Sequence, residues 1–367
     1  MKILLFRSNN LIASRCNKYV NFYLRKGIDF TAVGWDREAK GVKKEHYEFY
    51  QYNAGVSVGG LKAIMNHVHW MMFVYNYIKE HPEATTIHAC DLNSAFPAAI
   101  YKHLKNKQLV VIFDACDWFS ANFSKVKILR NIFQLMEKIA CMYSDKLIIC
   151  EPEREEQITF KLREKPLVLA NIPEIDRSLI SKNVEKYKFN NDWPTFSYFG
   201  GFTDDRFLLE ILELTKTEQF NLLIGGFGYQ PVEDLCMEVS KQDNVKYFGK
   251  MSMADGLTMT NSADVTYAMY CKTNPNHIYA APNKLYEALF LGKPIISNKG
   301  TIVEKKIVKY NIGYAIDETI DDLQNLIRSI SKEDMQEKGR NASKLWNEKY
   351  KNYVNDFFEL SYINILK

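Results

Sequence analysis

The stretch YAAPNKLYEALFLGKPII, residues 279–296, says most about the fold of this 367-residue chain. Pro282 suits the first turn of a helix, because its φ is already fixed and its missing N–H has no partner to lose there. Gly292 can take the left-handed position after the last turn, and Pro294 prevents continuation. The apolar stripe between these ends consists of Leu285, Ala288 and Leu289. The stretch therefore predicts a short helix with both ends fixed, followed by a strand.

The start of this predicted helix is suited to an anion. Its unpaired N–H groups and the positive end of its dipole attract negative charge, and Lys284 adds a cation in the first turn. A lysine there disfavours the isolated helix, and a bound diphosphate would reverse that effect. Asn283 and Glu287 share a helix face, so Glu287 could accept hydrogen bonds from both hydroxyls of a ribose. A solvent-facing glutamate on an ordinary helix is an equally good interpretation.

Short runs rich in Leu and β-branched residues recur on both sides of this stretch. In the first half they are KILLF (2–6), FTAVGW (30–35), TIHAC (86–90), LVVIFD (109–114), KLIIC (146–150) and PLVLAN (166–171). In the second half they are FSYFG (196–200), FNLLIGG (220–226), VKYFG (245–249), DVTYAM (264–269) and KPIIS (293–297). Each precedes a turn and a helix-period stretch, which is typical of βα units in a parallel sheet. Two such series predict two doubly wound α/β domains joined by the polar segment KFNNDWP, with ligands at the carboxyl ends of their strands.

Composition excludes several classes of protein. With 47% hydrophobic and 25% charged residues the chain is neither disordered nor fibrous, and a net charge of +4 is too small for a dedicated nucleic-acid binder. Residues 1–190 hold 28 basic and 20 acidic side chains, whereas residues 191–367 hold 20 and 24. The seven cysteines form no C-x-x-C pair and are odd in number, which predicts a reducing, cytoplasmic setting without a disulfide framework or zinc ribbon. No apolar run is long enough to span a membrane.

The motif P-N-K-L-Y-E-A-L-x-x-G-K-P-I-I resembles the donor-binding motif of glycosyltransferase family 4, the retaining enzymes with the GT-B fold. Other segments of the chain resemble the family in the expected order: VGWDR from Val33, HACDLNSAFPAA from His88, DKLIICEPE from Asp145 and VLANIPEID from Val168. The resemblance implies two Rossmann-like domains facing a cleft. They are an acceptor-side domain in residues 1–188, a linker in 189–194, a nucleotide-sugar donor domain in 195–345, and a C-terminal helix in 346–367 that could cross back to the first domain.

On the donor side, the family follows the first strand of its second domain with a glycine and two basic residues five positions apart. In YFGGFTDDR, from Tyr198, Gly201 stands at the first basic position and Arg206 at the second. The resemblance implies that Arg206 and Lys284 bind the pyrophosphate, and glycine at position 201 lets the backbone approach the ligand closely. Residues Tyr247 to Lys250 follow the third predicted strand of the second domain and are the candidates for binding the nucleotide base. An Arg206 paired with Asp204 or Asp205 is the alternative.

The sugar end of the donor site departs from the family. Family members carry two glutamates eight residues apart, the second at the ribose and the first at the transferred sugar. Here Glu287 keeps the ribose position and Tyr279 replaces the other glutamate. A phenol can still hydrogen-bond a sugar hydroxyl or lie against a sugar face, so we expect an altered choice of donor.

The acceptor side also departs from the family. In FDACDWF, from Phe113, Cys116 stands where a histidine is usual and Asp117 where a glutamate is usual. Asp117 could orient the acceptor hydroxyl, act as a weak base, or cap the next helix. His88 and Asp91 end the preceding predicted strand and could line the acceptor side, unless His88 is a satisfied strand-end histidine.

The resemblance implies a retaining transferase that moves a sugar from a nucleotide diphosphate, with UDP expected, to a hydroxyl of a glycan or lipid-linked oligosaccharide in bacterial surface polysaccharide synthesis. No cofactor, metal or nucleic acid is expected. The alternatives are a nucleotide-sugar epimerase or hydrolase, and a catalytically silent nucleotide-sugar-binding scaffold. The basic, apolar stretch from Asn122 to Ala140 could rest on the inner face of an anionic membrane, or could be an ordinary core-facing helix with a charged outer face.

Overall fold

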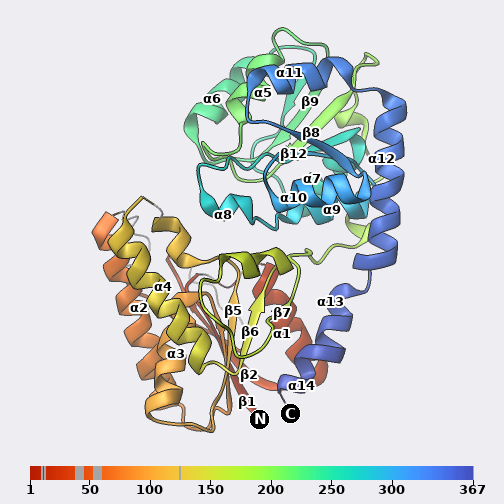
Figure 1. The fold of residues 1–367 in the computed structure, drawn as a ribbon. Helices are drawn as coiled ribbons and strands as arrows, with labels where there is room; N and C mark the ends of the chain where they lie inside the picture. Colours follow the sequence, from red (N-terminus) through yellow and green to blue (C-terminus); the bar gives the residue numbers. More distant parts are fainter. Residues whose placement is uncertain (10, 12–13, 38–44, 53–59, 124, 367) are drawn as a thin grey trace. The chain divides into compact units, whose positions relative to one another are not determined.

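A parallel sheet of seven strands forms the centre of the N-terminal unit (Figure 1). The computed structural model describes residues 1–9, 11, 14–37, 45–52, 60–123 and 125–366. In chain order the strands are β1 (Lys2–Arg7), β2 (Asp29–Trp35), β3 (Tyr47–Tyr50), β4 (Thr86–Cys90), β5 (Val110–Ala115), β6 (Lys146–Ile149) and β7 (Leu167–Val168). Their spatial order is β3-β2-β1-β4-β5-β6-β7. The order reverses between β1 and β4, and such a switch point is where doubly wound sheets bind ligands.

Helices cover both faces of this sheet. The longer ones are α1 (Ser14–Lys26), α2 (Gly60–Glu80), α3 (Leu92–Leu104) and α4 (Lys127–Tyr143), with short 3₁₀ turns at Phe119–Phe123 and Pro152–Gln157. Right-handed crossovers put α2, α3 and α4 on one face, because all three connect strands in the same direction across the sheet. The crossover through α1 runs the other way and puts α1 on the opposite face. Trp70 on α2 and Ala98 on α3 lie in the core between helices and sheet.

The end of the chain belongs to this N-terminal unit. Contacts within the chain group Met1–Ala170 with Val354–Lys367 and set Asn171–Tyr353 apart as a second unit. The tail contains two π-helical turns, Trp346–Tyr350 and Phe357–Tyr362, and the short helices α13 (Tyr353–Asp356) and α14 (Ile363–Ile365). Phe358 stacks on Phe22 of α1 with ring centroids 4.8 Å apart, and Tyr362 is fully buried. Phe358 and Tyr362 thus attach this segment to the N-terminal unit.

The C-terminal unit repeats the doubly wound plan with a six-stranded parallel sheet (Figure 1). Its spatial order is β10-β9-β8-β11-β12-β13. The strands are β8 (Thr195–Phe199), β9 (Asn221–Gly225), β10 (Val245–Tyr247), β11 (Val265–Tyr267), β12 (Ile295–Asn298) and β13 (Gly313–Ile316). Here the order reverses between β8 and β11. The predicted two-unit, doubly wound architecture is therefore present.

Eight α-helices accompany the second sheet in the described chain. They are α5 (Leu208–Leu214), α6 (Gln230–Val239), α7 (Met253–Ser262), α8 (Pro275–Ile278), α9 (Asn283–Leu291), α10 (Ile302–Tyr310), α11 (Ile320–Ser329) and α12 (Lys332–Leu345). The predicted short helix is α9, and Gly292 takes the expected left-handed conformation at its end, with φ +68°. Pro282 stands one residue earlier than expected, at the N-cap.

Residues before the predicted linker pack onto the C-terminal unit. Arg177 donates to the carbonyl oxygen of Phe290 at 2.8 Å, and the amide of Ser181 donates to Thr258 Oγ1 at 3.0 Å. The hydroxyl of Tyr187 donates to the carbonyl oxygen of Asp255. These contacts explain why the division between the units falls after Ala170, ahead of the polar segment 188–194.

Two further observations concern the cysteines and the helices. All seven cysteines are free thiols. Within the described ranges, the helices lack the combination of length and apolar content needed to cross a bilayer.

Candidate functional site

The first turn of α9 lies against the loop that leaves β8. Gly200 follows β8 with φ +150°, and a Cβ at this position would come within 2.6 Å of Lys284 Nζ. Glycine allows this backbone conformation and leaves space for the amine. A Cβ at Gly201 would meet nothing within 4 Å. The close approach predicted for Gly201 toward a ligand stays a prediction, whereas Gly200 makes room for Lys284.

Lys284 is surrounded by aromatic rings. Its Nζ lies 4.8 Å from the centroid of the Tyr198 ring and 6.0 Å from that of Tyr270. Burial disfavours the charged amine, but Tyr270, Tyr198 and Glu287 outweigh it and raise the pKa of Lys284 to about 12. Lys284 is therefore a fixed positive charge at the carboxyl edge of the sheet.

Arg206 shares one of these rings. Its guanidinium carbon lies 4.3 Å from the centroid of Tyr270, so the two cations approach the same aromatic side chain. Arg206 also lowers the pKa of Lys284, opposing the larger effects above, as expected of two like charges at short range. An anion between Arg206 and Lys284 would replace this repulsion with attraction to both.

Two side chains hold Arg206 in place. Its Nη1 donates to Asp205 Oδ1 at 2.9 Å and faces His277 Nε2 at 3.2 Å. His277 Nδ1 lies 2.9 Å from the carbonyl oxygen of Cys271, so in the neutral imidazole Nδ1 carries the proton and Nε2 accepts from Arg206. The ion pair with Asp205 that sequence alone left as an alternative is thus present. These contacts use only Nη1, whereas the guanidinium has five N–H donors.

Glu287 lies one turn along α9 from Lys284. The residue is buried, and burial raises the pKa of its carboxyl group, an effect that Lys284 partly opposes. Among the described residues the carboxylate has no hydrogen-bond or ion-pair partner, and its oxygens are not among the buried atoms that lack one, so they reach the surface of the unit. Such a group gains most from a ligand that donates hydrogen bonds, as a ribose does.

The other predicted donor residues lie on nearby elements. Asn283 begins α9 and is half-buried, and Tyr279 is the half-buried residue that ends α8. Lys250 follows the edge strand β10 and is exposed, with its amine 5.0 Å from the centroid of Phe227. The structure thus brings Lys284 and Arg206 to one aromatic ring, with Glu287 one helical turn from Lys284. The roles of Asn283, Tyr279 and Lys250 stay predictions.

His88, predicted for the acceptor side, lies wholly inside the N-terminal unit. Its Nδ1 is 2.7 Å from the Tyr362 hydroxyl and its Nε2 is 3.6 Å from Asp114 Oδ2. Both carboxylate oxygens of Asp114 accept from Arg15, which holds the pKa of Asp114 well below its usual value against the opposing effect of burial. Burial lowers the pKa of His88. This enclosure favours the structural interpretation of His88, although its Nε2 makes no hydrogen bond with the described residues and is 3.6 Å from the carboxylate of Asp114.

Cys116 and Asp117 have different surroundings. Cys116 is buried, burial raises the pKa of its thiol, and its carbonyl oxygen accepts from Cys150 Sγ. Asp117 is exposed and pairs with the buried Arg154 at 2.7 Å. Asp117 is therefore accessible to an acceptor, whereas the residue Cys116 is buried.

Asp91 has a geometry that the sequence did not disclose. It follows β4 at the switch point, next to the end of β1, with φ +63° and ψ 161°. That conformation is strained for any residue except glycine. Asp91 stands at the N-cap of α3 without a capping hydrogen bond, and its carboxylate lies 3.6 Å from Arg7 Nε. Burial raises the pKa of Asp91, with Arg7 opposing. An aspartate directly before a helix is typical of an ordinary N-cap, so the sequence gave no signal of the strained backbone at Asp91.

A trio of potential metal ligands lies beneath this edge. One ligand atom each of His88, Cys90 and Asp114 lies within 4.8 Å of the others. Arg15 already binds both oxygens of Asp114, and this cation disfavours a metal ion beside it. We therefore assign no metal to the trio.

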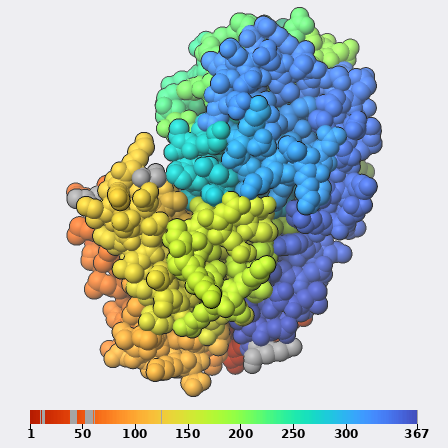
Figure 2. Space-filling model, in the orientation of Figure 1, coloured from red at the N-terminus to blue at the C-terminus, as the bar shows by residue number. Residues whose placement is uncertain are grey.

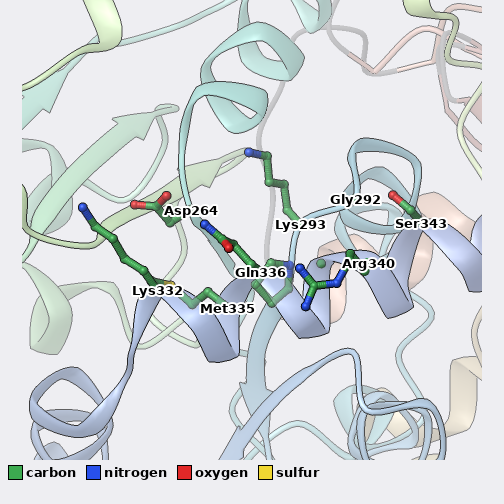
Figure 3. A pocket seen from close by; sticks show the side chains of 10 residues that line it. Asp264, Gly292, Lys293, Lys332, Met335, Gln336, Arg340 and Ser343 are labelled. Atoms are coloured by element: carbon green, nitrogen blue, oxygen red, sulfur yellow. The ribbon is translucent and has the colours of Figure 1, made fainter.

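The C-terminal unit also has a pocket of about 430 Å³ at the opposite edge of its sheet (Figure 3). Asp264 and Pro294, which precede β11 and β12, line it together with Lys293, Gln336 and Arg340. Ligands of doubly wound sheets bind at the carboxyl ends of the strands, so this pocket at the amino ends is not the donor site.

Comparisons with known proteins bear on this geometry. Residues 182–346 match the family model for glycosyl transferases group 1. No curated protein matches the sequence. The structure resembles a sucrose-phosphate synthase from Thermosynechococcus elongatus, with TM-score 0.75, 14% identity, and 100% of this chain and 99% of that chain covered. It also resembles Anabaena HepE in complex with UDP, with TM-score 0.73, 13% identity and 99% of each chain covered.

A third solved structure is a putative UDP-N-acetylglucosamine 2-epimerase from Listeria monocytogenes. It gives TM-score 0.62, 11% identity, and 98% and 96% coverage of this chain and that chain. Likeness at such identities establishes the fold, which is GT-B, as the sequence resemblance implied. The family match adds that residues 182–346 form a glycosyltransferase domain, so the expected enzyme class is confirmed.

Proposed function

We propose that this GT-B glycosyltransferase is a retaining enzyme of family 4 that uses a UDP-sugar. Its acceptor is a hydroxyl of a glycan or lipid-linked oligosaccharide in bacterial surface polysaccharide synthesis. Its N-terminal unit makes a peripheral contact with an anionic membrane. The observation that carries the proposal is the placement of Lys284 and Arg206 against the one ring of Tyr270, with buried Glu287 a turn away. Two close cations and an unpartnered carboxylate match a diphosphate followed by a ribose.

The two cations have a role in both binding and bond breaking. At an effective dielectric of about 20, one charge contact at ~4 Å has a Coulomb energy of roughly 4 kcal/mol before desolvation. As the bond from the anomeric carbon to the diphosphate oxygen breaks, negative charge grows on that oxygen, and Lys284 and Arg206 stabilise it. The acceptor oxygen then bonds the anomeric carbon on the same face and passes its proton to the leaving phosphate. Because two side-chain cations neutralise the diphosphate, the proposal includes no metal or other cofactor.

On the acceptor side we assign Asp91, with Asp117 as its neighbour. Asp91 ends β4 at the switch point in a strained conformation, and Arg7 holds its carboxylate. Asp117 helps to raise the pKa of Asp91 through charge repulsion. A carboxylate so placed can accept a hydrogen bond from the acceptor hydroxyl and orient it.

An epimerase of the same fold is the second candidate. The third is a catalytically silent scaffold, which is motivated by Tyr279 in place of a sugar-binding glutamate. Labelled UDP-sugars incubated with and without acceptors separate the possibilities. Acceptor-dependent release of UDP supports transfer, interconversion without acceptor supports the epimerase, and binding without turnover supports a silent scaffold. Calorimetry on Arg206→Met and Lys284→Met tests the site itself, and we expect each to weaken UDP binding ten- to a hundredfold. Unchanged affinity in both variants would refute the site.

A further inference from the structure

The pocket at the amino edge of the second sheet has an excess of positive charge (Figure 3). Its volume of about 430 Å³ falls within the roughly 300–1,000 Å³ that is typical of small-molecule sites. Among the described residues that line it, the cations are Lys293, Lys332 and Arg340, and the one carboxylate is that of Asp264. Asp192, which is exposed and outside the lining, lies 3.7 Å from Lys332 Nζ and balances part of that charge. The lining itself therefore has three cations, one carboxylate and a net charge of +2 at pH 7.

Within the described ranges, Lys293 and Arg340 lack a partner of opposite charge. Lys293 directly follows the C-cap of α9 and Arg340 lies on α12, and neither makes a hydrogen bond or an ion pair with the residues that the structure describes. Lys293 is half-buried, and burial lowers the pKa of its amine, an effect that Asp264 partly opposes. A desolvated ammonium group without a counter-ion is unfavourable, so an anion beside Lys293 would stabilise its charged form.

Two glycines fix the backbone beside these cations. Gly292 precedes Lys293 with φ +68°, and a Cβ at Gly292 would come within 2.3 Å of Ser343 Oγ on α12. Gly339 precedes Arg340, and a Cβ at Gly339 would come within 2.6 Å of the carbonyl oxygen of Gly292. The end of α9 and the middle of α12 therefore meet closely, and this junction fixes the backbone positions of both cations.

Uncharged and acidic groups beside the cations are suited to hydroxyl groups. Asp264 Oδ2 accepts from the amide of Thr195 at 2.8 Å, and its other oxygen has no hydrogen-bond partner among the described residues. The side-chain amide of Gln336, which lies between Asp264 and Arg340 in Figure 3, likewise makes no hydrogen bond in the described chain. A free carboxylate oxygen accepts from a hydroxyl, and a free amide both donates and accepts. Gln336 and Arg340 are exposed, and the blue surface that includes α12 is open in Figure 2, so a small molecule can reach α12 from solvent.

The charge and the polar groups of the pocket select one class of ligand. A phosphate monoester carries a charge of about −1.5 to −2 at pH 7, which matches the charge of the lining. No aromatic side chain is among the described residues of the lining, so a nucleotide base would have no ring to stack on.

We infer that the pocket binds a hydroxylated phosphate monoester such as a sugar phosphate, with its phosphate group between Lys293 and Arg340. Asp264 and Gln336 bind its hydroxyl groups. The site goes beyond the proposed function, because it lies past the end of α9, whereas the donor-site Lys284 lies in the first turn of that helix. A ligand in the pocket therefore does not compete with the donor.

Calorimetry on the full chain saturated with UDP tests this site, because UDP keeps the probe out of the donor site. We expect glucose 6-phosphate to bind about tenfold more tightly than inorganic phosphate, and glucose to show no binding. Lys293→Met and Arg340→Met should each weaken the binding of glucose 6-phosphate by about ten- to a hundredfold. Gln336→Glu should also weaken it, since the new carboxylate would repel the phosphate. The matched control is Lys344→Met, which removes a 72% exposed cation of α12 outside the pocket and should leave the affinity unchanged.

The same titration on Arg206→Met and Lys284→Met makes the result independent of the proposed donor site, and we expect both to bind glucose 6-phosphate as the unaltered chain does. Lys293→Met should keep or raise the melting temperature of the ligand-free protein, because it removes a half-buried amine without a counter-ion. Loss of probe binding on addition of UDP would overturn the inference, as would unchanged affinity in Lys293→Met and Arg340→Met. Equal affinities for inorganic phosphate and glucose 6-phosphate would also contradict it. So would a failure of glucose 6-phosphate, glucose 1-phosphate and glycerol 3-phosphate alike to bind.

Discussion

The imidazole Nδ1 of His88 lies 2.7 Å from the hydroxyl of Tyr362, 274 residues later in the chain. The same hydroxyl contacts that of Tyr23 on α1, and all three side chains are buried. The tail of the chain therefore completes a polar network inside the N-terminal unit. This contact gives residues 354–367 a structural role that is independent of the donor site.

Tyr362→Phe should destabilise the N-terminal unit, because it leaves His88 Nδ1 without its buried partner. We expect the free energy of unfolding to fall by about 1–3 kcal/mol, the usual penalty for an unpaired buried group. Chemical denaturation followed by tryptophan fluorescence measures this change. Leu360→Ala, on the same segment but 70% exposed, should change stability little. Equal stabilities of Tyr362→Phe and the unaltered chain would show that the network contributes nothing.

Gly200→Ala should impair the donor site without unfolding the unit. A Cβ there would meet Lys284 Nζ at 2.6 Å, and φ +150° is unfavourable for alanine, so the flexible amine should be displaced. We expect UDP affinity to fall by about tenfold, since one charge-assisted contact to a phosphate weakens. Gly201→Ala tests the other prediction for this loop, because its Cβ meets no protein atom within 4 Å and could impede only a bound ligand. Calorimetry that finds Gly200→Ala unchanged in UDP affinity would contradict the role of Gly200.

Glu287→Gln should separate stability from binding. The carboxyl has a raised pKa in the folded protein, so above its unfolded value of 4.5 the folded state binds more protons than the unfolded state. The free energy of unfolding therefore falls as pH rises through that window. We expect Glu287→Gln to raise the melting temperature of the ligand-free protein at pH 7 and to leave it nearly unchanged at pH 4. UDP affinity should fall in the same variant. A lower melting temperature at pH 7 would mean that the carboxylate is satisfied within the protein.

Much of the fold could be predicted because the central strands are continuous apolar runs between turns. The strands missed by sequence, β3 (Tyr47–Tyr50) and β13 (Gly313–Ile316), lie at sheet edges, where partial burial leaves no such run. Lys284 and Glu287 could be predicted because a single helix sets their spacing. The contact of Arg206 with His277 spans 71 residues and arises only in the folded chain. The enclosure of His88 by Tyr362 and the strained backbone at Asp91 likewise arise only in the folded chain.

Asp91→Asn should impair transfer while leaving donor binding intact. The change removes the negative charge beside Arg7 but keeps a side chain of the same shape, so the strained backbone at φ +63° is retained. If the carboxylate orients the acceptor hydroxyl, kcat for acceptor-dependent release of UDP should fall by a factor of roughly 10² to 10⁴ at constant UDP affinity. Asp91→Gly should lose activity equally but gain stability, because glycine tolerates this conformation. The comparison is Asp117→Asn, whose exposed ion pair with Arg154 predicts a smaller loss. Full turnover by Asp91→Asn would show that another residue orients the acceptor hydroxyl.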